Sequence, residues 1–500
     1  MNPVGYAALV DIFALEVSGL EHVSMLAAHG HRRTETRETE VVEWFPPQYD
    51  PGPHWTSHLG FALKHEGVRL EVLAALFDRA PEGELTAWVA ASPTGRYTRL
   101  AWFLHEWLKG SLLPLPDLTQ GNYVPALDPE KHLCLGAGKA DRVRRQRIVN
   151  NLPGTPAYCP LVRRTAVLAE FIAARPEEAA HRQLNAYPPE VMYRAAQYLY
   201  LKETKSSYAI ERLRPDARRT ARFVELLRRA GKEDCFSESA LADLQRTIVD
   251  ERYAAAGFRD FQNFIGQSLG PERELVHYVP PRPEDLRGLM AGWETVCRRM
   301  LPGGTHPVVA ATVAGFGFVF LHPFEDGNGR LHRYLMHHLL TAGGFTPPGI
   351  VFPVSAVLQK NPARYDALLE RYGRRVMARV KWQFTRAGAL EVSGDTAACY
   401  RYPDMTGIAE GMCGVVRDTL TAEFGEELAY LAAFDAARAE MRAVVEMPEN
   451  RLDLFIRLCL QGGGSLSARK RAQFPELTDG ECAELEAIVA EAAGQAGKPE

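Results

Sequence analysis

The sequence has few of the features that mark secreted, membrane or nucleic-acid-binding proteins. Its eight cysteines are scattered and form no CxxC pair, so we interpret them as free thiols in a reducing compartment. The longest apolar run, at 308–321, is too short for a membrane span, and MNPVGYAALVDIF lacks the pattern of a secretory signal. A net charge of −4 gives no general attraction to nucleic acid. We therefore expect a cytoplasmic protein with no membrane partner, and a nucleic-acid partner is disfavoured.

Internal repeats and low-complexity segments are also lacking, and helical patterning dominates. Apolar residues recur at helical spacing at 59–77 and 96–110, and Gly110 is a candidate C-cap. At 500 residues the chain is too long for one core. We predict a mainly α fold with three regions. The N-terminal region, 1–195, is mostly helical and contains a loop rich in Pro and Gly at 111–160. The core spans 196–387. A helical C-terminal region spans 388–500.

Two segments predict local structure near the core. The stretch 262–283 contains glycines and a Pro-Pro pair, which predict a β-hairpin and a turn. After it, helices are expected to continue to about residue 387, with a boundary at 400–404. The apolar run 308–321 predicts a buried helix, in which Gly315 and Gly317 would let a neighbouring backbone approach closely.

HPFEDGNGRLHR, at 322–333, follows that apolar helix directly. Pro323 predicts that the helix ends at His322, EDGNG predicts a tight loop, and a second helix is expected at 330–344. The free N–H groups and the dipole at the start of a helix favour an anion. Gly327 and Gly329 would let the backbone curl around phosphate oxygens without a Cβ in the way.

The charged residues of this stretch add chemistry to an anion loop. Arg330 and Arg333 lie three positions apart on one helix face, so they could clamp a polyphosphate together. Asp326 could hold Mg²⁺, which needs only one or two carboxylates when phosphates and water complete its shell. His322 would be a suitable general base. Each feature alone is ordinary at a helix end, but all of them together are not expected by chance.

HPFEDGNGRLHR resembles the Fic motif, H-x-F-x-[DE]-G-N-[GK]-R-x-x-R, and fills every defined position. The resemblance implies a Fic-type helical core with a β-hairpin flap, and transfer of AMP from ATP to a Ser, Thr or Tyr hydroxyl of a target protein. It implies that His322 deprotonates the hydroxyl and that Asp326 coordinates Mg²⁺. Gly329 favours nucleotidyl transfer, because the phosphorylating Doc branch has Lys there. The implied nucleotide-binding residues of the motif are Phe324, Gly327, Asn328, Gly329, Arg330 and Arg333.

The same resemblance extends to residues outside the motif. The flap at 262–283 implies target docking through an added strand, and its docking residues would be Phe264, Ile265 and Gly266. Downstream, 355–372 resembles the segment that closes the adenine pocket. Tyr365 is our candidate for contact with the base, and packing on a helix face is an equally good interpretation.

A second motif, SYAIER at 207–212, resembles the inhibitory motif of the family, [ST]-x-x-x-E-[GN]. It implies that Ser207 and Glu211 belong to an inhibitory helix whose Glu pairs with Arg333. Position 212 is Arg where the family has Gly or Asn, which puts the close backbone approach in doubt. Glu66-Gly67 is a rival, but Ala62 replaces the Ser or Thr.

Three functions stay open at this stage. The first is an autoinhibited adenylyltransferase that uses Mg²⁺, with ATP and an unknown target protein as partners; whether the target is the chain itself, and whether the chain forms a homodimer, are open. The second is the reverse reaction, hydrolytic removal of AMP at the same site. The third is a DNA-binding or scaffold protein with a nucleotide-sensing core, which the basic segment SLSARKRAQF at 465–474 suggests.

Overall fold

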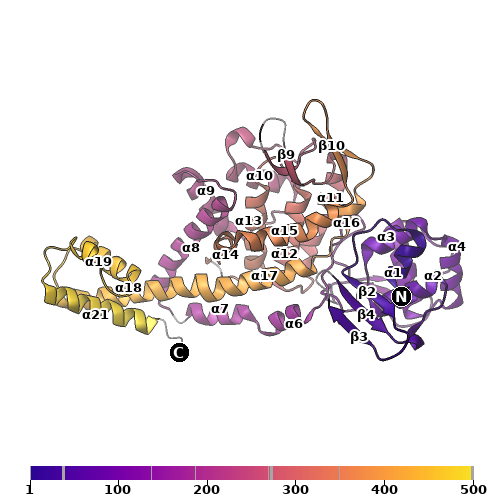
Figure 1. Ribbon diagram of the computed structural model, residues 1–500, viewed down its shortest axis with the longest axis horizontal. Helices are drawn as coiled ribbons and strands as arrows, with labels where there is room; N and C mark the ends of the chain where they lie inside the picture. Colours follow the sequence, from indigo (N-terminus) through magenta and orange to yellow (C-terminus); the bar gives the residue numbers. More distant parts are fainter. Residues whose placement is uncertain are drawn as a thin grey trace. The chain divides into compact units, whose positions relative to one another are not determined.

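A computed structural model of the chain is mainly α-helical, as predicted (Figure 1). It describes residues 2–36, 40–136, 138–185, 187–268, 270, 274–347 and 349–496. The chain forms two compact units, Met1–Glu170, Ala230–Gly343 and Ala363–Met412 in the first, and Phe171–Arg229, Gly344–Pro362 and Cys413–Glu500 in the second. The predicted division at 195 and 387 stays a prediction. All eight cysteines are free thiols, as predicted. Within the described ranges, no helix has the length and apolar character to cross a membrane.

The N-terminal part of the first unit is less helical than predicted. A four-stranded sheet has the order β1-β2-β4-β3, in which the β2–β4 pair is parallel. Its strands are β1 (Asn2–Val4), β2 (His22–Leu26), β3 (Arg33–Thr36) and β4 (Val41–Phe45). The looped region at 111–160 also contains a small sheet, made of β5 (Val124–Pro125), β6 (Asp141–Val143) and β7 (Ile148–Asn150). These strands are too short for their alternation to stand out in the sequence.

Around these sheets lie helices whose apolar faces form one core. The prediction of one continuous helix at 59–77 is wrong. Gly67 adopts φ 84°, which is not a helical conformation, and it separates two helices. The helix expected at 96–110 is confirmed, and Gly110 caps it in the left-handed region. The helices are α1 (Tyr6–Phe13), α2 (Trp55–His65), α3 (Leu70–Arg79), α4 (Glu82–Ala91) and α5 (Arg96–Lys109).

The centre of the first unit is a pair of packed helices, α12 (Pro307–Leu321) and α13 (Asn328–Ala342). Every residue of α12 after its first is buried, as predicted for an apolar helix. A Cβ on Gly315 would lie 2.8 Å from the His332 ring and 3.2 Å from its carbonyl oxygen, so glycine is what lets the two helices approach. Around the pair lie α10 (Glu238–Ile248), α11 (Pro283–Met300), α15 (Pro362–Met377) and α16 (Ala398–Arg401).

Two hairpins lie side by side in this unit (Figure 1), and only one was predicted. The hairpin expected within 262–283 is confirmed as β8 (Ile265–Ser268) paired with β9 (Glu274–Tyr278). The helix expected up to residue 387 is wrong, since β10 (Lys381–Phe384) pairs with β11 (Leu390–Ser393). The alternation KWQF and the turn glycine Gly388, at φ 80°, were the missed signals.

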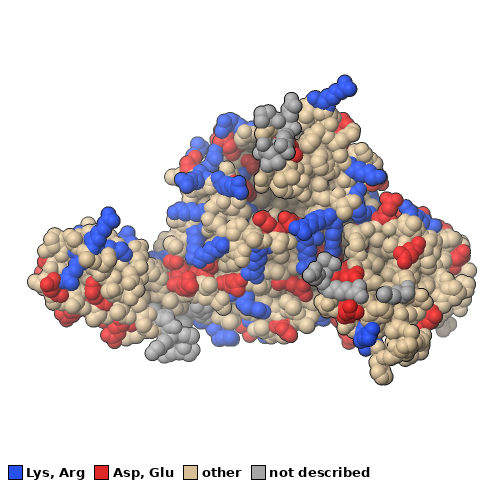
Figure 2. All heavy atoms as spheres, in the orientation of Figure 1, with Lys and Arg blue, Asp and Glu red and all other residues tan. Residues whose placement is uncertain are grey.

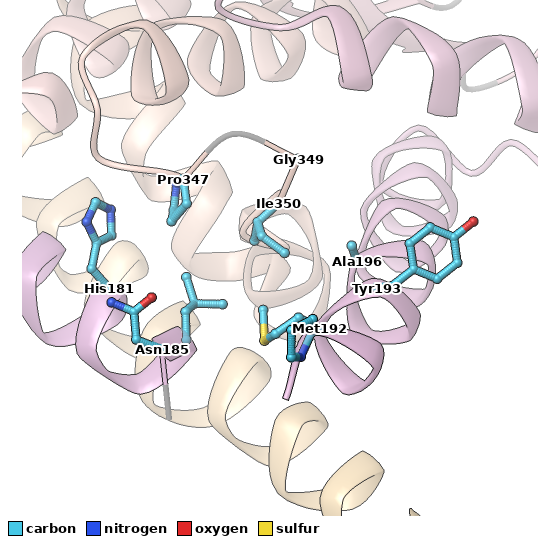
Figure 3. A pocket seen from close by; sticks show the side chains of 10 residues that line it. His181, Asn185, Met192, Tyr193, Ala196, Pro347, Gly349 and Ile350 are labelled. Carbon is cyan, nitrogen blue, oxygen red and sulfur yellow. The ribbon is translucent and has the colours of Figure 1, made fainter. Parts of the chain in front are cut away.

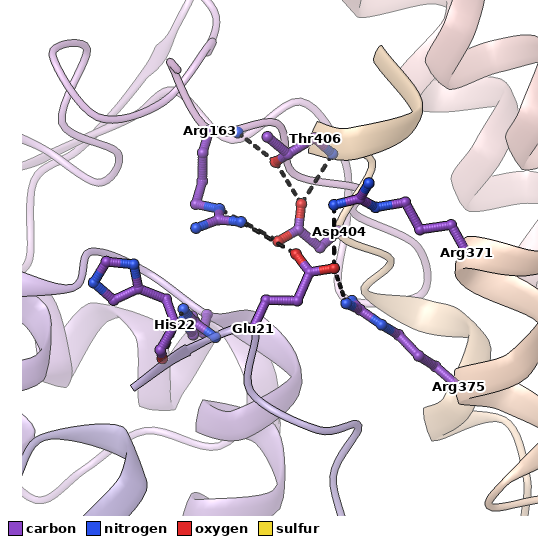
Figure 4. Close-up of polar contacts among 8 residues, drawn as sticks. Glu21, His22, Arg163, Arg371, Arg375, Asp404 and Thr406 are labelled. Atoms are coloured by element: carbon purple, nitrogen blue, oxygen red, sulfur yellow. Dashed lines mark hydrogen bonds and ion pairs between the residues drawn. The ribbon is translucent and has the colours of Figure 1, made fainter. Parts of the chain in front are cut away.

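Ion pairs between residues far apart in sequence join the N-terminal part to α15 (Figure 4). The Glu21 carboxylate lies 3.4 Å from Arg163 and 3.4 Å from Arg371, and it also pairs with Arg375. Arg163 reaches Asp404 as well, at 3.4 Å. One carboxylate therefore holds cations from two separate parts of the chain.

Among the described residues of the second unit, all regular secondary structure is helical. Helix α8 (Pro189–Ile210) packs on α14 (Val354–Lys360), where the buried Glu203 carboxylate accepts the Ser355 backbone N–H at 2.9 Å. A cavity of about 410 Å³ is lined by residues of α7 (Pro176–Asn185) and α8 together with Pro347, Gly349 and Ile350 (Figure 3). The other helices are α9 (Ala217–Arg229), α18 (Gly425–Val444), α19 (Glu449–Gln461), α20 (Ala468–Arg471) and α21 (Asp479–Ala496). The helices α6 (Ala166–Ala173) and α17 (Thr406–Asp418) cross between units.

Candidate active site

His322 caps the C-terminus of α12 in a left-handed conformation, at φ 49°. Its ring Nδ1 lies 3.1 Å from the Val319 carbonyl oxygen. Because a carbonyl only accepts, Nδ1 carries the proton and Nε2 keeps its lone pair. Burial lowers the pKa of His322 to about 4. The imidazole is therefore neutral at physiological pH, in the form that accepts a proton through Nε2.

The loop after His322 is closed by the side chain of Asn328. Its Oδ1 accepts the Phe324 backbone N–H at 3.1 Å, and its Nδ2 donates to the Phe324 carbonyl at 2.8 Å. The Phe324 ring is 1% exposed and packs between Phe258 and Phe318. Asn328 therefore closes the loop, and Phe324 anchors it in the apolar core. Binding of a nucleotide by either residue stays a prediction.

The turn into α13 needs the glycine that the motif supplies. Gly327 has φ 88°, and a Cβ there would lie 2.8 Å from Val249 Cγ1. Helix α13 then begins at Asn328, two residues earlier than expected. Gly329 and Arg330 follow in its first turn, where backbone N–H groups have no acceptor inside the helix. The geometry therefore supports the predicted anion loop at the start of α13.

The two motif arginines are both buried on α13, each with 2% exposure. Arg330 donates from Nη2 to Asp326 Oδ1 at 2.8 Å and from Nη1 to the Ile248 carbonyl at 3.2 Å. Arg330 therefore orients Asp326 in this structure. Arg333 follows three positions later on the same face, and contact of either with phosphates stays a prediction.

Asp326 fits a magnesium ligand that relies on substrate phosphates. Its side chain is 43% exposed, and its hydrogen bonds to Arg330 and to the Gly327 N–H both use Oδ1. Within the described ranges, no three acidic, His or Cys side chains cluster as a metal site. Mg²⁺ commonly binds one or two carboxylates and takes its other ligands from phosphates and water, so Asp326 alone is an adequate anchor.

Two residues that the sequence did not reveal support this loop. Gln245, fully buried in α10, donates from Nε2 to the Asp326 carbonyl at 3.1 Å and to the Tyr253 carbonyl at 2.8 Å. Arg259 donates from Nε to the His322 carbonyl at 2.9 Å. Neither stands in a recognisable motif, so only the tertiary structure identifies them.

The flap residues lie at the base of the β8–β9 hairpin. Ile265 pairs with Tyr278, and Gly266 pairs with Val276 across a bulge. A Cβ on Gly266 would lie 2.4 Å from the Leu275 carbonyl, which explains the glycine. The Phe264 ring packs edge-on against Phe384 of β10, with centroids 5.5 Å apart. The hairpin tip at 269 and 271–273 lies outside the described residues, and target docking by the flap stays a prediction.

Tyr365 lies on α15 in the first unit and packs against His332 of α13. It is 7% exposed, its hydroxyl is 3.3 Å from His332 Nδ1, and the two rings stack with a 10° angle between planes. This is the helix-packing role that we weighed as the alternative. Contact with a nucleotide base stays a prediction.

The candidate inhibitory residues lie at the end of α8, in the second unit. Ser207 is fully buried and Glu211 is the C-cap residue. Arg212 has φ 57°, and the backbone closes as a Schellman motif, with the Leu213 N–H 3.0 Å from the Tyr208 carbonyl. Gly or Asn is favoured at such a position, which explains the family pattern and identifies Arg212 as a strained exception.

The rival Glu66 has a structural role in the N-terminal part. Its Oε2 accepts the Tyr6 backbone N–H at 2.8 Å, and the Tyr6 hydroxyl donates to the Gly67 carbonyl at 2.8 Å. Glu66 therefore ties α1 to α2, and Glu211 remains our candidate for an inhibitory carboxylate.

The chain is thus a mainly α protein in which a neutral His ends one buried helix and a glycine turn opens the next. Residues 235–340 match the model of the Fic/DOC family. The chain therefore carries a Fic/DOC-family domain.

Two curated relatives match part of the chain. The protein adenylyltransferase Fic of Nematostella vectensis is 40% identical over 123 residues, which is 24% of this chain and 26% of that protein. The protein of the same name from Aedes aegypti is 43% identical over 118 residues, 23% of this chain and 22% of that protein. The chain thus spans about a quarter of the length of the curated relatives it matches.

Two solved structures cover more of the chain with lower similarity. A Fic family protein from Desulfovibrio desulfuricans G20 has 20% identity and a TM-score of 0.34, over 63% of this chain and 85% of that chain. A Fic-domain-containing signaling protein from Bacteroides thetaiotaomicron has 16% identity and a TM-score of 0.36, over 50% of this chain and 96% of that one. At these TM-scores the similarity supports no conclusion about the fold.

Proposed function

We propose that this protein is an adenylyltransferase that moves AMP from ATP to a hydroxyl side chain of a target protein. The observation that carries the proposal is His322, whose Nδ1 is bound to the Val319 carbonyl so that Nε2 is the base, beside the glycine turn that opens α13. The names of the curated relatives and the match of residues 235–340 to the Fic/DOC family support the same reaction. We also propose that the protein works in the cytoplasm, which its free cysteines support.

In the proposed reaction the chain positions two reactants and stabilises charge. The N–H groups at the start of α13, with Arg330 and Arg333, hold the phosphates. His322 Nε2 takes the proton of the target hydroxyl, the hydroxyl oxygen bonds to the α-phosphorus, and the bond to the β-phosphate oxygen breaks with its electron pair, so that pyrophosphate leaves. Asp326 would hold Mg²⁺, which neutralises phosphate charge when bound.

We further propose that Glu211 restrains this activity by pairing with Arg333 in place of the γ-phosphate. Support comes from its place as the C-cap of α8 and from the left-handed residue that follows it, where the inhibitory motif has Gly or Asn. A carboxylate at that cation would compete directly with a phosphate oxygen for the same hydrogen bonds.

The test compares wild type, Glu211→Gly and His322→Ala with Mg²⁺ and α-labelled ATP, read by label and intact mass. We expect Glu211→Gly to gain one AMP at least ~10-fold faster than wild type, because couplings of about 1–3 kcal/mol are typical between linked sites. The double variant Glu211→Gly/His322→Ala should gain none. Glu211→Gln, which keeps the side-chain shape but not the charge, is the matched control for the carboxylate.

Two outcomes would contradict parts of the proposal. Labelling of the His322→Ala double variant at the parent rate would exclude His322 as the base. If no variant is labelled but AMP is lost from a pre-modified target, the chain catalyses removal instead of transfer.

A role on nucleic acid is not part of the proposal. In the basic segment, Arg471 pairs with Asp479 and Lys470 Nζ donates to the Leu458 carbonyl at 3.2 Å. On the face shown in Figure 2, positive and negative side chains intermingle. Binding of the full chain to DNA that weakens steeply between 50 and 200 mM salt would overturn this view.

A further inference from the structure

Arg259 is a buried cation whose side chain binds backbone carbonyls from three places in the chain. It is 6% exposed. Nε donates to the His322 carbonyl at 2.9 Å, Nη1 donates to the Phe261 carbonyl at 2.8 Å, and Nη2 donates to the Pro281 carbonyl. Phe261 precedes β8 and Pro281 follows β9, so one guanidinium joins both ends of the flap hairpin to the end of α12.

The main chain of Arg259 reinforces this connection. Its backbone N–H donates to the Pro323 carbonyl at 2.9 Å. His322 and Pro323 are therefore both held by one residue, through its side chain and its backbone. Asn263 adds a bond from the same segment, because its Nδ2 donates to the Phe324 carbonyl at 3.3 Å.

Burial makes this arrangement costly, which argues against an incidental role. Desolvation lowers the pKa of Arg259 to about 10. Across the described ranges, no carboxylate pairs with Arg259, and buried cations are normally paired. Residues that break such rules concentrate at functional sites.

The conformation of His322 explains why support is needed there. At φ 49° a non-glycine residue is strained, and such strain persists only where surrounding contacts fix it. The left-handed conformation also turns the His322 carbonyl away from the helix axis, and Arg259 supplies its hydrogen-bond donor. The Val319 carbonyl binds the ring at Nδ1, and Arg259 holds the backbone from which the imidazole projects.

We propose that Arg259 is a positioning residue that fixes the base His322 and the two ends of the flap in one rigid arrangement, so that a hydroxyl held by the flap meets Nε2. This inference rests on the proposed adenylyl transfer. Arg259 would act through His322 and the hairpin, without touching ATP. Three acceptors in different directions require the fork of a guanidinium, so Lys cannot replace it.

The first measurement is hydrogen–deuterium exchange of Glu211→Gly, alone and combined with Arg259→Lys or Arg259→Met. Arg252→Lys, at a side chain that is 79% exposed, is the matched control. We expect peptides covering 260–266 and 319–325 to exchange at least ~10-fold faster in both Arg259 variants, while 308–316 is unchanged. Should Arg259→Met fail to fold, Arg259→Lys carries the comparison, because it keeps the charge.

The second measurement separates positioning from binding in the same variants. We expect ATP affinity, by calorimetry with Mg²⁺, to change less than ~3-fold, and the rate of AMP incorporation to fall at least ~10-fold. Equal losses in affinity and rate would overturn a positioning role. Three exchange results would also overturn it. Exchange could rise in only one of the two segments, it could rise uniformly along the chain, or it could stay at the parent level in Arg259→Lys.

The two readouts also separate this inference from the proposed function. If the Glu211→Gly parent incorporates no AMP, the adenylyl transfer fails, whereas exchange still shows whether Arg259 couples His322 to the flap. If the parent is active and exchange is unchanged, only the role of Arg259 fails.

Discussion

At the scale of single residues, backbone conformation explains which positions of the two motifs tolerate which side chains. His322 and Arg212 both adopt positive φ without being glycine. At His322 the strain accompanies the proposed base. At Arg212 nothing in the proposed chemistry needs an arginine, so a substitution could remove the backbone strain without loss of function.

Arg212→Gly should therefore stabilise the end of α8. Removing a Cβ from a left-handed position is expected to raise the free energy of unfolding by about 1 kcal/mol. Denaturant unfolding of wild type and variant measures it. Arg214→Gly is the matched control, because Arg214 is exposed and has no positive φ; there, glycine should give no gain. Equal effects at both positions would contradict the argument.

A second residue-scale prediction concerns pH. His338 is 4% exposed, and its Nδ1 accepts the Gly231 N–H at 3.1 Å. Burial lowers its pKa to about 4, with Asp234 opposing the shift. The unfolded chain therefore binds this proton first, near pH 6.5. The free energy of unfolding should fall by about 1.4 kcal/mol per pH unit from this group as pH drops from 6.5 to 4.

His338→Asn tests this prediction, because Asn offers an acceptor oxygen near Nδ1 and does not titrate. Between pH 7 and 5 the variant should lose about 2 kcal/mol less stability than wild type. His29→Asn, at an exposed position, is the matched control for exchanging a His for Asn. An identical pH dependence in His338→Asn and wild type would show that His338 is not held neutral.

At the scale of elements, the contact between α12 and α13 determines where the base and the anion loop meet. Gly315→Ala should be destabilising by about 1–2 kcal/mol. Its Cβ would lie 2.7 Å from Met336 Cγ and 2.8 Å from His332 Cδ2, and overpacking of about 1–3 kcal/mol outweighs a gain in helix propensity of about 1 kcal/mol.

Gly288→Ala in α11 is the matched control, since a Cβ there meets no atom within 4 Å. It should stabilise the protein by about 0.5–1 kcal/mol through propensity alone. Thermal unfolding of both variants measures the contrast. A Gly315→Ala variant as stable as wild type would mean that the two helices separate without penalty.

At the scale of the first unit, Glu21 connects parts of the chain more than a hundred residues apart. It is 21% exposed and pairs with Arg163, Arg371 and Arg375. Glu21→Gln should lower the free energy of unfolding by roughly 1–2 kcal/mol, because two partly buried cations, Arg163 and Arg375, and the exposed Arg371 lose their shared carboxylate.

Glu370→Gln provides the comparison, because Glu370 is 52% exposed and pairs with Arg374, four positions along the same helix. Such surface pairs contribute roughly 0–1 kcal/mol. Denaturant unfolding at low and high salt should show a larger and less screened loss for Glu21→Gln. Equal losses would place Glu21 among ordinary surface ion pairs.

The sequence by itself determined the helix–loop–helix at 308–342, the hairpin within 262–283 and the mainly α class. Their signals are local: an unbroken apolar run, a proline after His322, and glycines at turns with positive φ. For the same reason the candidate base and the anion loop could be named from the local sequence, whereas the inhibitory motif could be named only from its resemblance to the family pattern.

Only the tertiary structure decided the rest. Gln245, Arg259 and Glu21 act through partners tens or hundreds of residues away, which no local pattern encodes. At Gly67 the surrounding packing decided between a continuous helix and a break between α2 and α3. At 381–393 it decided between a helix and the β10–β11 hairpin. Contacts between distant segments fix these choices, because each segment alone has too little buried surface to select one conformation.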